Sequence, residues 1–149
     1  MTSMVYKMSD VISLSDDFQE KFSVLNNLKS GEKLIIENSM LHKDSTSTYL
    51  QPFTRWWDNQ GRNRIIDYIQ SEIETYISFL NFVRGAHFSS KCAPREKTQL
   101  LRIYQENITF INDIINGMEA LKITYESSID IVTNFNFLIE KLTHIPKLN

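Results

Sequence analysis

The chain has 149 residues and a formal net charge of −2, with 42% apolar residues, four glycines, three prolines and one cysteine. This length and apolar content suit one domain with its own core, and they exclude a disordered chain or a small disulfide-held scaffold. Because Cys92 is the only cysteine, no intramolecular disulfide is possible, and we expect an intracellular protein. The N-terminus lacks a secretory signal pattern, and acidic residues interrupt the most apolar window, residues 65–83, so no membrane span is expected.

The N-terminal part has the pattern of a short amphipathic helix. Between Asp10 and Leu28, five apolar residues recur at helical spacing and share one face: Val11, Leu14, Phe18, Phe22 and Leu25. The run Ser15-Asp16-Asp17 offers an alternative start, as the N-cap of a shorter helix that begins near Asp16. The sequence Lys29-Ser30-Gly31 is expected to end the helix in either case.

A short strand and an aromatic segment follow. The run Leu34-Ile35-Ile36 is short and rich in β-branched residues, which predicts a strand, and residues near Met40-Leu41 are placed to pair with it in a hairpin. The polar stretch 43–48 is expected to be a surface loop. Residues 49–57 contain Tyr, Leu, Phe and two Trp, and we expect this segment to form an aromatic corner that closes one end of the core.

Two longer stretches repeat apolar residues with the heptad spacing that is typical of coiled coils and helical bundles. The first begins at Arg62 and is expected to end near Gly85, with the seam Ile66, Ile69, Ile73, Tyr76, Leu80 and Val83. Pro94 occupies a favourable first position for the second helix. Its seam is Leu101, Tyr104, Ile108, Ile111, Ile115 and Met118, and after Gly117 the phase changes to Leu121, Tyr125, Ile129, Val132, Phe135, Ile139 and Leu142.

The phase change at Gly117 leaves two arrangements open. Either the chain turns near Gly117 and forms an antiparallel three-helix core, or residues 95–142 form one helix about 72 Å long. Such a helix would overhang its partner, and a second protomer would cover the rest of the stripe. The candidate interface residues are then Ile111, Ile115, Ile129 and Val132. We favour the turn, although a glycine costs a helix interior only about 1 kcal/mol.

These patterns together predict a mainly α fold: a helical bundle or long helical hairpin with a short N-terminal helix and a minor β element. We expect one domain over residues 1–149. Residues 1–61 would hold the N-terminal helix, the strand and the aromatic corner, and residues 62–145 the long-helix bundle.

No recognised catalytic, metal or cofactor motif occurs in the sequence. The histidines, His42, His87 and His144, are too far apart for a zinc motif, and the four glycines are each isolated, which excludes a glycine-rich phosphate loop. Cys92 is flanked by Lys91 and lies near Arg95, an environment that can activate a thiol, but we favour a non-catalytic role for it. We therefore expect no cofactor and no enzymatic activity.

Two groups of basic residues are candidates for binding. Arg55, Trp56, Trp57, Arg62 and Arg64 combine cations with aromatic rings, as single-stranded nucleic-acid binders do, although core aromatics with stacked arginines give the same pattern and are favoured. The second group surrounds the connector between the two long helical stretches and suits docking onto acidic protein surfaces. It consists of Arg84, Lys91, Arg95, Lys97 and Arg102.

Three short motifs carry a resemblance: Gly31-Glu32-Lys33-Leu34, Tyr49-Leu50-Gln51 and Thr54-Arg55-Trp56-Trp57, with Arg62 further on. This region, about residues 29–75, resembles a group of small uncharacterised proteins encoded by large DNA viruses of eukaryotes. The resemblance implies a helical viral accessory or virion component and carries over no catalytic residue. We expect a structural or protein-interaction protein that acts through self-association or docking to a larger assembly. A nucleic-acid-associated factor is the alternative.

Overall fold

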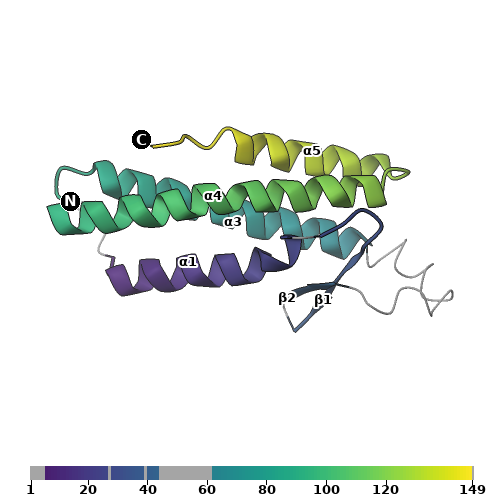
Figure 1. Cartoon of the computed structure of the whole chain (residues 1–149), viewed down its shortest axis with the longest axis horizontal. Helices are drawn as coiled ribbons and strands as arrows, with labels where there is room; N and C mark the ends of the chain where they lie inside the picture. The colour runs from purple at the N-terminus through teal and green to yellow at the C-terminus, as the bar shows by residue number, and fades with distance from the viewer. Residues whose placement is uncertain (1–5, 27, 39, 44–61, 149) are drawn as a thin grey trace.

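The computed structural model describes residues 6–26, 28–38, 40–43 and 62–148 (Figure 1). Its helices are α1 (Met8–Phe22), the short 3-10 helix η1 (Ser23–Leu25), α3 (Arg62–Phe88), α4 (Pro94–Thr124) and α5 (Ile129–Thr143). Two strands, β1 (Leu34–Glu37) and β2 (Met40–Lys43), lie between η1 and α3. The predicted mainly α fold with a short N-terminal helix and a minor β element is confirmed.

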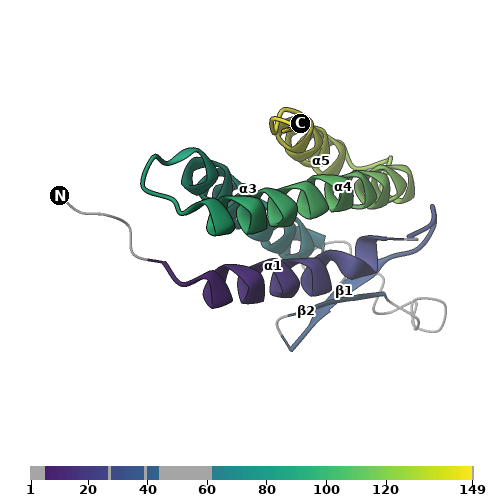
Figure 2. The same ribbon diagram turned by 60° about the vertical axis from the view of Figure 1, so that its left-hand side comes forward.

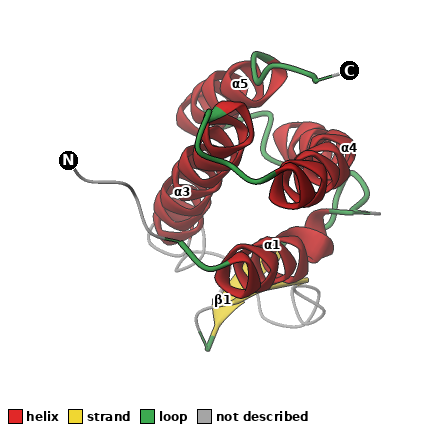
Figure 3. Ribbon diagram, turned by 90° about the vertical axis from the view of Figure 1, so that its left-hand side faces the viewer, coloured by secondary structure: helices red, strands yellow, loops and turns green. Residues whose placement is uncertain are grey.

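The helices form a bundle in which α3 and α4 are central. Figure 3 looks along the bundle and shows α1 on one side of the α3–α4 pair and α5 on the other. Asn107 of α4 bonds to Ser15 of α1, and Gly117 lies against Leu25, so α1 and α4 run in the same direction. The chain turns back between α3 and α4 and again between α4 and α5, which gives an up-down-up-down order.

The β element is an antiparallel hairpin with Leu34 opposite Lys43 and Glu37 opposite Met40. The predicted hairpin is confirmed, although Lys43 belongs to β2 and not to the predicted loop. Asn38 begins its turn with a φ of 52°, a left-handed conformation that asparagine tolerates better than most residues. β1 contacts α3 and β2 contacts α1, and the buried Leu34 and Leu41 join the hairpin to the helical core (Figure 2). The predicted polar loop, from residue 44 on, and the aromatic segment 49–57 lie outside the described residues.

The antiparallel arrangement of α3, α4 and α5 that we favoured is present, but the predicted turn near Gly117 is wrong, and so is the single helix over residues 95–142. α4 continues through Gly117 to Thr124, and the chain turns at residues 125–128, so α5 folds back along the same chain. A Cβ atom at Gly117 would lie 2.7 Å from the Cβ of Leu25 and closer still to its carbonyl oxygen. Glycine at this position therefore permits a close approach of η1 to α4 and does not end the helix.

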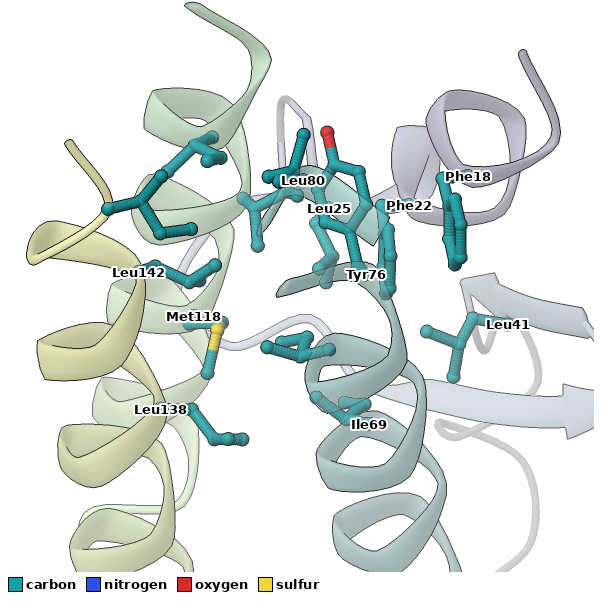
Figure 4. Close-up of a cluster of buried hydrophobic side chains, with 14 of the residues drawn as sticks. Phe18, Phe22, Leu25, Leu41, Ile69, Tyr76, Leu80, Met118, Leu138 and Leu142 are labelled. Atoms are coloured by element: carbon teal, nitrogen blue, oxygen red, sulfur yellow. The ribbon is translucent and has the colours of Figure 1, made fainter. Parts of the chain in front are cut away.

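The core extends through the whole bundle. Figure 4 shows Phe18 and Phe22 of α1 beside Tyr76 of α3, and Met118 of α4 facing Leu138 of α5. On α3 the predicted seam is buried except for Ile66, which is half-buried. On α4 the buried face is broader than one seam, because this helix contacts α1, α3 and α5.

Several details of the predicted helix faces are wrong. On α4, Leu101, Ile108 and Ile115 of the predicted seam are only half-buried. α1 begins at Met8, so the alternative start near Asp16 does not occur, and Leu14 is 46% exposed while Ser15 occupies the buried position. At the start of α5, Ile129 is 80% exposed and Ile131 is buried in its place. Because the polar Ser15 lies on the buried face of α1, the apolar pattern alone misplaced that face. The sequence did not predict the turn before α5, and this turn changes which residues of α5 are buried.

Candidate interaction surface

Polar side chains gather at two places in the bundle, and the first of them is closed to solvent. Asn107 is fully buried and donates through Nδ2 to Ser15 Oγ at 2.9 Å and to the Ile103 carbonyl at 2.8 Å. Its Oδ1 accepts a hydrogen bond from the Tyr76 hydroxyl and a longer one from Gln19. This network joins α1, α3 and α4 and satisfies its own polar groups, so we assign it to packing and register. Asn107 also lies in an Asn-x-Thr triplet, and its burial makes this side chain inaccessible to glycosylation in the folded chain.

The second place is a hollow beside the connector that joins α3 to α4, and we name it the connector hollow. Its volume is about 620 Å³, within the range of small-ligand sites. It is lined by Tyr6, Phe82, Gly85, Ala86, Ser89, Ser90, Lys91, Cys92 and Glu96. The last turn of α3, the connector and the first turn of α4 therefore build it together with one residue that precedes α1.

Tyr6 forms one wall of the connector hollow. Its ring meets Phe82 edge-on, with 5.5 Å between the ring centroids, and its hydroxyl donates to Glu96 Oε2 at 3.3 Å. The hydroxyl oxygen also lies 4.0 Å from Cys92 Sγ. Burial, helped by the neighbouring Cys92 and Glu96, raises the pKa of Tyr6 to about 12. Tyr6 thus stays a neutral donor at physiological pH and ties the N-terminal segment to α4.

The segment that forms most of the connector hollow carries an excess of positive charge. Residues 84–102 contain five basic side chains and one acidic, a net charge of +4 in a chain whose total is −2. Lys91, Arg95 and Arg102 are exposed and Lys97 is half-buried. Within the described residues, none of these four cations makes an ion pair. This segment therefore presents positive charge without an ion-pair partner in the described part of the chain, and it also contains the exposed Phe88, which is 62% accessible.

Most of the arginine and tryptophan residues that the sequence singled out for binding lie outside the described part of the chain. Arg55, Trp56 and Trp57, like the side chain of Arg62, lie outside the described residues, and Arg64 is exposed at the start of α3. This hypothesis of an arginine and tryptophan patch stays untested.

The four apolar candidates for an interface do not form one exposed face. Ile111 is buried in the core of the single chain, and Ile115 and Val132 are half-buried. Of the four, only Ile129 is fully open to solvent. α5 thus occupies the position that the overhanging-helix arrangement left for a second protomer.

Sequence reasoning found the cations of this surface but missed its hollow. The charge excess over residues 84–102 is visible in the sequence, whereas Tyr6 reaches Glu96 across 90 residues and no local pattern predicts that contact. Gly85 was interpreted as a helix end, yet α3 continues to Phe88, and the missing side chain at Gly85 helps to open the hollow.

Comparison with known proteins identifies no relative: no family model, curated protein or solved structure matches this chain. Among the described residues, no helix is long and apolar enough to cross a bilayer. The same residues contain no group of three or more His, Cys, Asp or Glu side chains placed to hold a metal ion.

Proposed function

We propose that this chain is a non-enzymatic protein-interaction module that docks onto another protein through the surface around the connector hollow. The observation that carries the proposal is the coincidence of a concave site with a local excess of cations, of which Lys91 lines the hollow and Arg95 precedes its wall residue Glu96, and which make no ion pair among the described residues. Such a field steers association with a surface of opposite sign. The exposed Phe88 at the end of α3 adds the kind of aromatic contact area that is enriched in interfaces.

The sequence also suggested self-association through the apolar seam of residues 95–142, and we favour docking over it. That seam is covered within one chain, because α5 packs along α3 and α4. The resemblance of residues 29–75 to small proteins of large DNA viruses extends the proposal to a partner inside an infected cell or a viral particle. This location is part of the proposal and rests on the motif residues alone.

Site-directed photo-crosslinking tests the docking surface. The photoreactive amino acid p-benzoyl-phenylalanine is placed at Ser90, an exposed residue of the connector hollow, in cells that naturally make the chain. The matched control places it at Ser127, which is exposed in the α4–α5 turn at the other end of the bundle. We expect a defined protein adduct from Ser90 and none from Ser127.

A charge-reversal variant sharpens this test. Lys91→Glu combined with Arg95→Glu replaces two positive charges near Ser90 with two negative ones, a change of four charge units, and alters no buried residue. The proposal predicts that the Ser90 adduct disappears in this variant and fades as the salt concentration rises, because exposed charges are screened. Equal adducts from Ser90 and Ser127, no adduct at all, or an adduct to nucleic acid would each contradict it.

A further inference from the structure

We infer that the partner presents an acidic segment with one large apolar side chain, and that this side chain enters the connector hollow while the acidic residues meet the surrounding cations. The inference rests on the proposed function and specifies the chemistry of the partner. It follows from the difference between the inside of the hollow and its surroundings.

The inside of the connector hollow is suited to an apolar group. Phe82 and Ala86 are four residues apart on α3 and thus lie on the same side of the helix, with Gly85 between them. Tyr6 closes the wall with its ring edge-on to Phe82. A pocket with aromatic and small-residue walls favours a single buried anchor, the kind of residue that dominates many protein interfaces.

The position of Glu96 disfavours an acidic group at the Tyr6 side of the hollow. Glu96 lies in the wall and accepts the hydrogen bond of Tyr6, so a carboxylate or phosphate that entered beside it would be repelled at short range. Lys91 lines the hollow at the connector, and Arg95 and Arg102 lie on α4; all three side chains are exposed. An apolar anchor with acidic neighbours satisfies both regions, whereas a nucleic-acid backbone supplies phosphate to both.

Gly85 provides a way to close the hollow without disturbing the bundle. A Cβ atom at this position has no other atom within 4 Å, and the residue lies in α3 without a positive φ. Gly85→Trp should therefore place an aromatic side chain in the connector hollow, and Gly85→Ala is the matched control that leaves most of the space open. Both variants should fold, since a side chain is favoured over glycine in a helix.

The test is a titration followed by two-dimensional nuclear magnetic resonance of the whole chain. The probes are two capped synthetic peptides, Glu-Glu-Asp-Phe-Glu-Glu and the same peptide with Gly in place of Phe, and an oligothymidylate. We expect the Phe peptide to shift the amide signals of residues that line the hollow, and to bind at least about tenfold more tightly than the Gly peptide, because it buries a large side chain. Gly85→Trp should weaken its binding at least about tenfold, while Gly85→Ala should not.

Other outcomes separate this inference from the proposed function. Equal binding of the two peptides, binding of neither, or full binding to the Gly85→Trp variant would overturn the apolar anchor. If the crosslink at Ser90 persists in any of those cases, the docking surface stands with a different partner chemistry. Tighter binding of the oligothymidylate than of the Phe peptide, with the same signals shifted, would overturn the acidic protein segment as well.

Discussion

Gly117 and Gly85 offer a matched pair of substitutions that should shift stability in opposite directions. Both glycines lie in long helices, so replacement by alanine gains up to about 1 kcal/mol of helix propensity at each site. At Gly117 the new methyl group would lie 2.7 Å from Leu25 Cβ and closer still to the Leu25 carbonyl oxygen. Since part of this contact is backbone, it cannot be relieved by rotating a side chain.

These magnitudes predict that Gly117→Ala lowers the free energy of unfolding. Overpacking of a filled core typically costs about 1 to 3 kcal/mol, and a backbone clash belongs at the upper end of that range. After the gain in propensity, we expect the free energy of unfolding to fall by about 1 to 2 kcal/mol. Gly85→Ala meets no atom within 4 Å, so it should raise the same free energy by about 0.5 kcal/mol.

Urea denaturation followed by far-ultraviolet circular dichroism measures both values, and the denaturant slope must stay unchanged for the comparison to hold. The midpoint should fall for Gly117→Ala and rise slightly for Gly85→Ala. A Gly117→Ala protein as stable as the original would refute the close approach of η1 to α4.

Three further predictions follow from burial and titration. Ile131→Ala should lower the free energy of unfolding by about 2 to 4 kcal/mol, whereas Ile129→Ala, two residues earlier and exposed, should change it by less than about 0.5 kcal/mol, as denaturation of both variants will reveal. Asn107→Ala should cost about 2 to 4 kcal/mol by the same assay, because it leaves a cavity and the buried Ser15 hydroxyl loses its donor; a neutral effect would exclude the network as a stabilising element. The folded state disfavours the phenolate form of Tyr6. The neutral Tyr6 hydroxyl should therefore contribute its full stability below pH 10, and this contribution should be lost as the pH rises towards about 12. The stability gap between the original protein and Tyr6→Phe should close over that interval, and a constant gap would contradict the burial of this hydroxyl.

Local signals predicted the elements of the fold well. The start of α3 at Arg62, the start of α4 at Pro94 and the hairpin around Asn38 follow from periodicity, from proline at a helix start and from β-branched residues, all of which act within a few residues. The turn before α5 was missed because Tyr125–Ser128 contains neither glycine nor proline. Gly117 led us to predict a helix end at the wrong residue. This glycine instead permits close packing against Leu25, which is distant in the sequence.

Long-range contacts explain the rest of what the sequence did not predict. The stripe of α1 appeared to include Leu14 because apolar spacing alone ranks leucine above serine, yet Ser15 faces Asn107 in the core. Only part of the candidate site could be predicted from the sequence, for the same reason. Its charge excess is a local property of residues 84–102, while its concavity depends on Tyr6, which arrives from the other end of the chain.

The position of the connector hollow follows from how the bundle fixes its register. Asn107 holds α1, α3 and α4 at one level along the bundle axis, because a slip of any of the three helices would leave buried polar groups unpaired. With that level fixed, α1 places its N-terminal extension beside the first turn of α4, so Tyr6 reaches Phe82 and Glu96. The buried network thus determines the shape of a surface that it does not touch, and disruption of Asn107 should alter binding at the hollow even where the helices remain folded.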